Sequence, residues 1–368
     1  MTLLRRVSIS TLAAVLAGSV VSGPAQAALD PAAVAAVVAS AADAAASSAP
    51  VSTGGGVVER AAAVAAGNAG SPAVLRARAA VAEDYWTAAR KASATPADLP
   101  SASSAFSASP SSPASRGGSA VAGARPRAGT SGSFAGVGPS GIRTLDATTD
   151  SMTGRIFFVD DKGENRSCSG STINSNGKRI VFTAGHCVHG GGSGRTWFDV
   201  SRWIFEPAYH NGSPYGTWTA QSLWTKTGWI NDANRSYDVA AAVMQDKDGK
   251  HIVDVVGGQG IRWGSGYNRA ETMLGYPSAA PYNGTKLITC PGATADDGGF
   301  PMLECTMTGG ASGGPWLDEY GVRNWAYVNG VSSWQFWRDG DQSKVYKWQS
   351  PYFSDDTAGS LFNLVKDK

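Results

Sequence analysis

Three short passages carry residue types that together support nucleophilic chemistry. They read TAGHC up to residue 187, YDVA around Asp238 and GGASGGP around Ser312. A serine hydroxyl is a weak nucleophile until a base removes its proton, and an acid must hold that base in one tautomer. His186, Asp238 and Ser312 are therefore predicted to act as general base, orienting acid and nucleophile.

The glycines on both sides of Ser312 allow the backbone to turn tightly around the nucleophile. Such a turn lets the amides of Gly310 and Ser312 point at one position, where they would stabilise an oxyanion. One donor of this kind contributes on the order of 3 kcal/mol to a transition state. We expect these two amides to form an oxyanion hole.

The order of the three groups along the chain separates competing interpretations. The stretch GASGG also fits the G-x-S-x-G turn of α/β-hydrolases, but there the histidine follows the serine, and no histidine follows His251. A subtilisin order needs an acid before His186, where Asp160 and Asp161 stand, yet the surrounding pattern lacks that fold's helices. Of the three orders considered, only His, Asp, Ser fits both the motifs and the predicted β pattern.

The residues directly after each aspartate decide which one is the candidate acid. Asp238 directly precedes the apolar run Val239–Val243, which places its carboxylate at the start of a predicted strand. The competing aspartates are Asp199, Asp232, Asp246 and Asp254.

Aromatic residues divide the 368-residue chain near position 150. Trp86 and Tyr85 are the only Trp and Tyr before that point, while all four Cys and all four His lie after it. Because aromatic side chains build a core, we expect a folded domain over 146–368. Its short β-branched and aromatic runs, separated by turn residues, indicate an all-β sandwich or barrel.

The predicted strands include eight runs, and the best helix candidate is the C-terminal Thr357–Val365. The runs are Arg155–Asp160, Lys178–Thr183, Thr196–Phe205, Thr217–Thr225, Asp238–Met244, Thr272–Tyr276, Leu287–Cys290 and Trp325–Val331.

The four cysteines predict two disulfides, for which three connectivities are possible. The local pairings are Cys168 with Cys187 and Cys290 with Cys305. A zinc site is the alternative, but the chain has no C-x-x-C pair. We therefore expect neither a metal nor an organic cofactor. His189, His210 and His251 are interpreted as solvated loop residues.

The first part of the chain has the composition of a leader. Residues 1–27 combine a basic start, an apolar stretch and an A-x-A site, which predicts a signal peptide and export to the extracellular space. Residues 28–145, rich in Ala, Ser and Pro, are interpreted as a low-complexity pro-region and linker, largely disordered or partly helical. We expect processing between Arg127 and Thr153, with Arg127 or Arg143 as the cleaved residue.

The three passages, in this order, resemble the catalytic motifs of the chymotrypsin-fold serine proteases. The cysteine directly after His186 is also typical of that family, and the resemblance extends from about Thr153 to the C-terminus. TGGASGGP is closest to the bacterial glutamyl-endopeptidase-like (V8-like) branch. The resemblance implies two six-stranded antiparallel β-barrels with the triad in the cleft between them, and hydrolysis of peptide bonds through an acyl-enzyme; the helix predicted at Thr357–Val365 would dock on the barrel.

Departures from the family pattern limit what the resemblance implies about activation and specificity. Ala311 stands where trypsin-type enzymes have the aspartate that pairs with a new N-terminus, so that activation switch is not expected. Thr306 stands where trypsin-like enzymes carry the acid that binds Lys or Arg. The segment before Trp334 lacks the histidine of glutamyl endopeptidases. The resemblance places the substrate pocket at Thr306, Met307, Ser332, Ser333 and Trp334, with the hydroxyls of the Thr and Ser residues and of Thr308 available to substrate.

Charge and composition limit which functions and partners remain for this chain. The 31 basic and 29 acidic residues are interspersed, so no nucleic-acid partner is predicted, and no membrane partner is expected once the signal peptide is removed. We expect a secreted, monomeric serine endopeptidase made as a zymogen and acting on proteins or peptides. The alternatives are an inactive protease homologue and a carbohydrate-binding or adhesive module, which the 12 Trp would suit.

Overall fold

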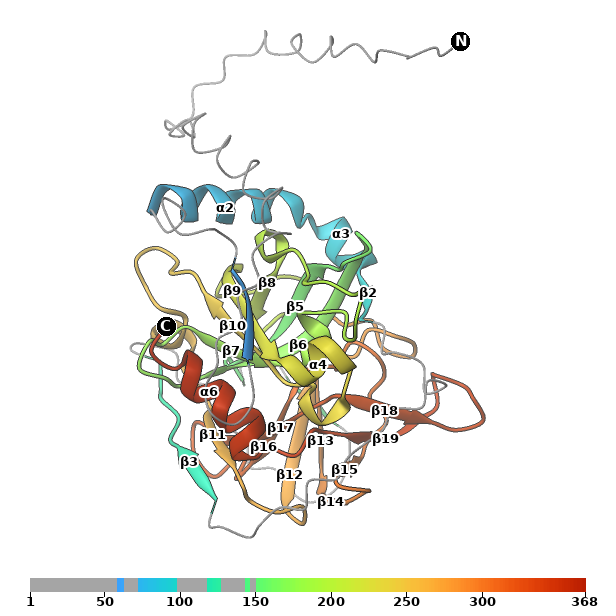
Figure 1. Cartoon of the computed structure of the whole chain (residues 1–368). Helices are drawn as coiled ribbons and strands as arrows, with labels where there is room; N and C mark the ends of the chain where they lie inside the picture. Colours follow the sequence, from blue (N-terminus) through green and yellow to red (C-terminus); the bar gives the residue numbers. More distant parts are fainter. Residues whose placement is uncertain (1–57, 63–71, 98–117, 127–142, 146–149) are drawn as a thin grey trace, which may run out of the picture.

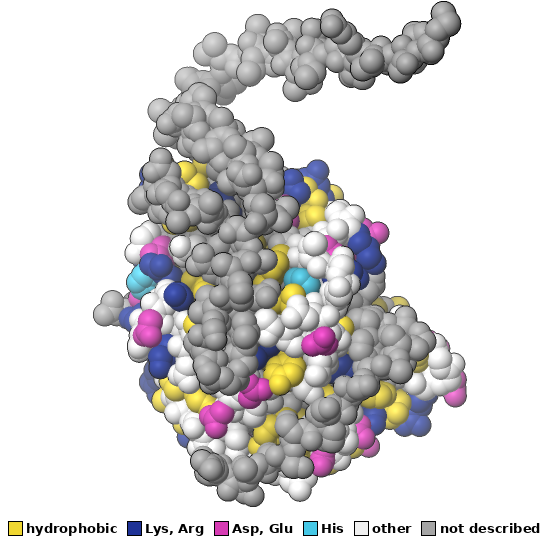
Figure 2. All heavy atoms as spheres, in the orientation of Figure 1, with side chains coloured by type: hydrophobic (Ala, Val, Ile, Leu, Met, Phe, Trp, Pro, Cys, Tyr) yellow, Lys and Arg dark blue, Asp and Glu magenta, His cyan; other side chains and the backbone are white. Residues whose placement is uncertain are grey.

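The computed structural model describes residues 58–62, 72–97, 118–126, 143–145 and 150–368 (Figure 1). The predicted signal peptide and Arg127 lie outside these ranges. No helix within them is long and apolar enough to cross a membrane. Figure 2 shows basic and acidic side chains mixed over the visible face.

Six antiparallel strands form a closed barrel in the first half of the described domain. They are β5 (Thr153–Val159), β6 (Asn165–Ile173), β7 (Ile180–Thr183), β8 (Ile204–Pro207), β9 (Trp218–Lys226) and β10 (Ala240–Met244). The sheet runs β9–β10–β7–β6–β5–β8, and β8 pairs with β9 to close it. All residues of β5, β7, β8 and β10 are buried, so the runs of β-branched, aromatic and alanine residues fill the barrel.

The strands of the second half pair in two sheets rather than in one closed ladder. The larger sheet has the order β3–β11–β17–β16–β12–β13–β4, in which β3 is Ser119–Val121 and β4 is Arg143–Leu145, and the smaller has the order β14–β15–β19–β18. Within the larger sheet β11 and β17 are parallel. The bounds are β11 (Gly260–Trp263), β12 (Ala270–Gly275), β13 (Leu287–Ala293), β14 (Ala295–Asp296), β15 (Pro301–Glu304), β16 (Pro315–Asp318), β17 (Tyr327–Val331), β18 (Trp334–Trp337) and β19 (Val345–Gln349).

The two sheets of the second half meet between β17 and β18. The amide of Ser332 donates to the carbonyl of Gly314, whereas the amide of Ser333 donates to the carbonyl of Gln349 in the smaller sheet. The backbone thus changes partner within two residues. The expected all-β fold with a C-terminal helix is confirmed: a six-stranded ladder closes in the first half, and the described strands of the second half form the two sheets.

Within the described ranges the helices are few and short. They are α2 (Pro72–Tyr85), α3 (Ala88–Ser93), α4 (Thr227–Asp232), α5 (Ile252–Val256) and α6 (Ser360–Val365). A π-helical turn, Asp355–Gly359, leads into α6 and is closed by a capping box between Ser354 and Thr357. The predicted C-terminal helix is therefore present, and it buries Leu361, Phe362 and Val365.

One predicted strand was largely wrong. Within Thr196–Phe205 only the last two residues enter β8, because the Asp199 carboxylate accepts from the Ser201 amide and caps a 3₁₀ turn, Val200–Arg202. Conversely, β6 was not predicted, since its sequence NRSCSGSTI lacks a hydrophobic alternation. Both disulfides have the local pairing, Cys168 with Cys187 and Cys290 with Cys305.

Segments before residue 150 extend these sheets. The strands β1 (Val58–Ala62), β2 (Thr95–Pro96), β3 (Ser119–Val121) and β4 (Arg143–Leu145) pair with β9, β6, β11 and β13. Arg143, named above as a cleavage candidate, is opposite Thr289 in this pairing. Cleavage after Arg143 would therefore first require β4 to leave the sheet.

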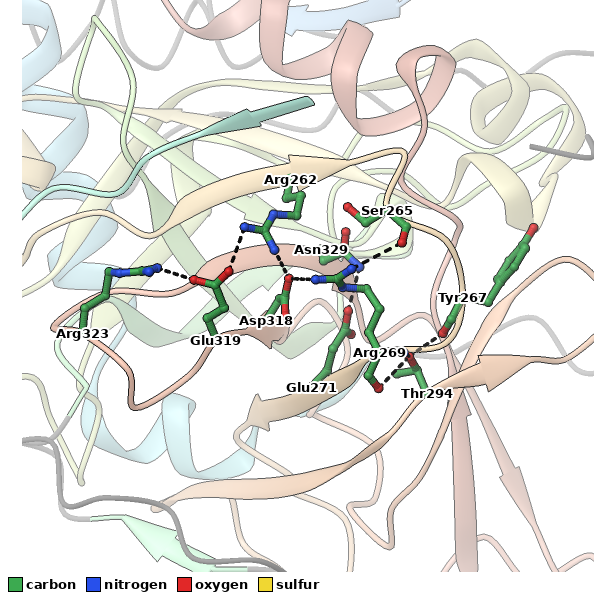
Figure 3. Close-up of polar contacts among 10 residues, drawn as sticks. All are labelled: Arg262, Ser265, Tyr267, Arg269, Glu271, Thr294, Asp318, Glu319, Arg323 and Asn329. Atoms are coloured by element: carbon green, nitrogen blue, oxygen red, sulfur yellow. Dashed lines mark hydrogen bonds and ion pairs between the residues drawn. The ribbon is translucent and has the colours of Figure 1, made fainter. Parts of the chain in front are cut away.

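A polar cluster lies on the larger sheet of the second half (Figure 3). Arg262 and Arg269 both donate to the same carboxylate oxygen of Asp318. Beside them, the buried Glu271 accepts from Asn329 Nδ2 at 2.6 Å. Burial, followed by the charge of Asp318, raises the pKa of Glu271 to about 7.

Candidate active site

Asp238 fixes the position of His186 through two hydrogen bonds. The His186 amide donates to Asp238 Oδ1 at 2.7 Å, and the ring Nδ1 lies 2.8 Å from Oδ2. His186 lies in the 3₁₀ turn Gly185–Cys187, where a Cβ on Gly185 would lie only 2.9 Å from Asp238 Oδ1. The other ring nitrogen, Nε2, is buried and has no hydrogen-bond partner among the described residues. It is the ring atom left to accept a proton.

The Asp238 carboxylate is completely buried and accepts a third hydrogen bond. The Asp238 residue directly follows the 3₁₀ turn Arg235–Tyr237, which Asn234 caps, and it lies before β10. Ser333 Oγ donates to Asp238 Oδ2 at 2.6 Å. Three contacts on one buried carboxylate hold it in one orientation.

The competing aspartates are engaged elsewhere or lie apart from the histidine ring. Asp199 caps the turn before β8, Asp246 pairs with Arg179, and Asp254 pairs with Lys178. Asp232 lines the cavity described below, but the contact with His186 Nδ1 is made by Asp238.

Two contacts from β6 fix the loop that carries Ser312. The Ser169 amide donates to the Ser312 carbonyl at 2.7 Å, and Ser169 Oγ donates to the Gly310 carbonyl at 2.9 Å. Gly310 has φ +99°, and a Cβ there would lie 2.3 Å from Ser278 Oγ, so only glycine fits. The amides of Gly310 and Ser312 donate to no other described residue, which leaves both free for an oxyanion.

One cavity of about 970 Å³ brings His186 and Ser312 together. Its lining includes Gly190–Ser193 and Asn231–Ala233 from the first half. From the second half it includes Gly309, Trp334 and Gln335. Asp238 lies behind the histidine ring, away from this lining. A carbonyl compound in the cavity would thus reach both a base and a hydroxyl.

Most of the predicted pocket residues do not line this cavity. Trp334 does, and the Arg235 guanidinium stacks 4.3 Å from its ring centre. Thr306 is exposed, and Met307 is fully buried with its carbonyl accepting from Trp348 Nε1 at 2.9 Å.

Three of the four hydroxyls expected to face substrate, those of Thr308, Ser332 and Ser333, bond within the protein. Ser332 Oγ accepts from Trp316 Nε1 at 3.1 Å, and Thr308 Oγ1 donates to the Ala279 carbonyl at 2.6 Å. Ser333 Oγ contacts Asp238, as described above. Ser332 and Ser333 therefore support the site from behind.

His189 is not the solvated loop residue expected from its glycine neighbours. Its side chain is buried, its Nδ1 accepts from the Gly191 amide at 3.0 Å, and its ring meets Trp197 edge to face. Burial lowers the pKa of His189 to about 4, while nearby Asp161 acts in the opposite direction. His210, in contrast, is exposed as predicted.

The described residues contain one group with the proximity of metal ligands, Cys168, His186 and Cys187. Both sulfurs are bound to each other in a disulfide, and His186 Nδ1 contacts Asp238. A thiolate site is therefore not available there.

Two supporting residues were missed by sequence reasoning. Ser169 connects β6 to the nucleophile loop and also accepts from the Tyr276 amide at 2.8 Å. Arg235 stacks on Trp334 and bonds to Gln349. The position of Ser169 directly after Cys168 is a weak sequence signal for a supporting role. No feature of the sequence indicated such a role for Arg235.

The chain is similar to solved structures of bacterial proteases. Protease Anisep from Arthrobacter nicotinovorans is 32% identical with a TM-score of 0.56, and the match covers 62% of this chain and 100% of that one. The thermostable serine protease AL20 from an extremophilic microorganism is 29% identical with a TM-score of 0.54, over 59% and 97%. A Glu endopeptidase in complex with MPD is 18% identical with a TM-score of 0.47, over 63% and 99%. The sequence matches no protein-family model and none of the curated proteins.

Proposed function

The chain belongs to the chymotrypsin-fold serine proteases, and we propose that it is a secreted endopeptidase that cleaves peptide bonds through Ser312. One observation carries the proposal: His186, held by Asp238 through Nδ1, lines the same cavity as Ser312 and has its Nε2 unpartnered among the described residues. A base oriented in this way can take the serine proton as the hydroxyl attacks a carbonyl.

The proposed reaction has two halves. In the first, Ser312 Oγ bonds to the peptide carbonyl carbon while its proton passes to His186 Nε2. The carbonyl oxygen becomes an oxyanion within reach of the Gly310 and Ser312 amides. As the C–N bond breaks, His186 returns the proton to the leaving nitrogen, and an acyl-enzyme ester remains. In the second half water replaces the amine and the same proton transfers release the acid, while Asp238 keeps the imidazole oriented.

Substrate and surroundings follow from the same proposal. The substrates are proteins or peptides, with Trp334 forming one apolar wall of the cavity. No cofactor is needed for this reaction, and the chain would act outside the cell as a monomer after processing between Arg127 and Thr153. N-terminal sequencing of the secreted protein tests the processing step, and a protein that starts at Ala28 would contradict it.

The distribution of tryptophan argues against a carbohydrate-binding module. All twelve Trp lie in the described ranges, and none is exposed. Trp203, Trp218 and Trp229 are among the largest fully buried side chains. They therefore form core rather than a stacking platform for sugars.

Hydrolysis of casein by the full chain, with Ser312→Ala as the matched variant, tests the proposed function. We expect the substitution to reduce the rate by about 10⁴-fold or more, because the nucleophile is lost. Circular dichroism of both proteins verifies that they are equally folded. Equal rates would contradict the mechanism, and binding on a sugar array without hydrolysis would favour the binding module.

A further inference from the structure

Residues 72–97, here named the N-terminal arm, are anchored on the closed barrel by aromatic side chains. Trp86 is buried; its Nε1 donates to the Arg202 carbonyl at 2.7 Å, and its ring lies 5.5 Å from that of Phe157. Tyr85 donates from its hydroxyl to Asn165 Oδ1 at 2.8 Å. Figure 1 shows α2 and α3 of the arm lying across the end of the barrel near β8 and β9.

A buried ion pair adds a second anchor. Lys91 Nζ lies 2.5 Å from Glu206 Oε1, and the Glu206 side chain is only 2% exposed. A carboxylate buried to this degree is destabilised when its cation is removed. The adjacent Arg90, in contrast, donates to the Tyr85 carbonyl within the arm itself.

The end of the arm lies in the catalytic cavity. Thr95, Pro96 and Ala97 line the same cavity as His186 and Ser312. Pro96 packs so closely on Gly309 that a Cβ at Gly309 would lie 2.9 Å from Pro96 Cβ.

Backbone pairing holds this end against β6. The Ala97 amide donates to the Ser167 carbonyl at 3.1 Å, and Arg166 Nη1 donates to Thr95 Oγ1 at 3.0 Å. β2 is parallel to β6, and two residues beyond Ser167 the Ser169 amide holds the Ser312 carbonyl. The arm therefore runs along β6 toward the nucleophile loop.

We propose that the N-terminal arm is an intramolecular inhibitor that occupies part of the substrate cleft until it is released; this inference rests on the proposed function. An extended peptide binds most readily by pairing with a free strand edge. At Arg166 and Ser167, beside Ser312, that edge is taken by β2. Substrate must displace the N-terminal arm. The strength of the contacts that anchor the arm therefore determines the rate of the full chain.

Substitutions in the full chain that weaken the anchors test this inference. Lys91→Glu places a second carboxylate beside Glu206, and Trp86→Ala removes the buried indole. Lys91→Arg keeps the ion pair, and Arg90→Ala is the matched control because Arg90 bonds within the arm. For each protein we would measure the rate of fluorophosphonate labelling and the hydrolysis of a short peptide. Hydrogen exchange of the peptide that contains Ala97 reports release of the arm.

We expect Lys91→Glu, Trp86→Ala and the variant that combines the two to expose the Ala97 amide. Each should raise the rates of fluorophosphonate labelling and of peptide hydrolysis about tenfold or more. Lys91→Arg and Arg90→Ala should match the wild type. A released arm with unchanged rates would overturn the inhibition while leaving the protease function intact. An arm still protected in the double variant would overturn the assignment of its anchors. Absence of labelling and hydrolysis in every protein, including the released ones, would contradict the proposed function and this inference with it.

Discussion

At the residue scale, the hydrogen bonds on Asp238 determine what His186 can do. The carboxylate accepts from the His186 amide, lies 2.8 Å from the ring Nδ1 and accepts from Ser333 Oγ. Because both its oxygens are engaged, the carboxylate cannot rotate without losing a charge-assisted hydrogen bond in a buried position. The imidazole is thereby kept with Nε2 toward the cavity. Ser333 acts on the reaction through Asp238 and is a positioning residue.

Replacing Ser333 by alanine should therefore slow the chemical step without weakening substrate binding. We expect kcat to fall about tenfold with KM nearly unchanged, since a buried hydrogen bond to a charged group contributes about 2 kcal/mol. Ser333→Thr, which keeps a hydroxyl, should restore most of the rate. Steady-state kinetics on a peptide substrate separate the two constants, with Ser201→Ala in the 3₁₀ turn before β8 as control. A rise in KM at constant kcat would instead indicate a pocket role for Ser333.

His189 predicts an acid-sensitive contribution to stability. Its pKa is lowered to about 4 in the folded protein, against about 6.5 in an unfolded chain. Below pH 6.5 the unfolded chain takes up a proton that the folded protein does not, so the free energy of unfolding falls by up to about 3 kcal/mol as pH drops from 6.5 to 4. Urea unfolding across this range should show a shallower pH slope in His189→Gln than in wild type. Identical slopes would contradict the assignment.

The sequence located the residues whose signal is local and missed those whose partners are distant. His186 and Ser312 lie in short motifs, and both line one cavity; their catalytic roles stay a prediction. The resemblance placed Ser333 in the substrate pocket, whereas its hydroxyl contacts Asp238. The sequence could not reveal this contact, because it joins residues 95 positions apart. Nothing in the residues near Ser333 indicates that contact.

At the scale of elements, hydrophobic pattern predicted four strands of the barrel, β5, β7, β9 and β10, but largely missed β8 and did not predict β6. β5, β7 and β10 consist of apolar runs, which the pattern identifies directly. β6 buries serines instead, and their hydroxyls bond to residues of other elements, as Ser167 Oγ does with Arg155 of β5 and Ser169 Oγ with Gly310. Such a strand has polar residues because it holds other loops in place. A hydrophobicity pattern cannot detect that role.

The larger second-half sheet carries a titratable group, Glu271, whose effect on stability changes with pH in the direction opposite to that of His189. Burial raises the pKa of Glu271 to about 7, so its contribution to stability is complete below pH 4.5 and is lost as pH rises through 7. We expect wild type to lose up to about 3 kcal/mol of unfolding free energy across that range relative to Glu271→Gln. Chemical denaturation at several pH values measures the difference. A stability difference between the two proteins that does not change with pH would contradict this assignment.

At the scale of the whole molecule, the described segments before residue 150 belong to the same sheets as the rest. β3 and β4 occupy opposite ends of the larger second-half sheet, and the Trp86 side chain is part of the barrel core. The composition of 28–145 gave no indication of this, because strands of three residues and a single indole leave little trace in a segment rich in Ala, Ser and Pro. The contacts that define these strands come from residues far along the chain.

A chain that begins at Thr153 should consequently be less stable than the full chain. It loses the Trp86 side chain from the core and exposes the edges that β3 and β4 cover. Loss of a buried Trp alone costs about 3 kcal/mol or more. We expect a lower guanidinium midpoint and aggregation at high concentration, both measurable by equilibrium unfolding and light scattering. Equal midpoints would show that the earlier segments contribute nothing to the fold.

The central claim is that His186 activates Ser312, and the most direct measurement is the site of reaction with a fluorophosphonate probe in the full chain. Mass spectrometry of the digested protein should find the phosphonyl group on Ser312. The adduct should be absent in Ser312→Ala and nearly absent in His186→Ala, with circular dichroism unchanged. An adduct on another residue, or labelling of Ser312 at the same rate without His186, would contradict the account.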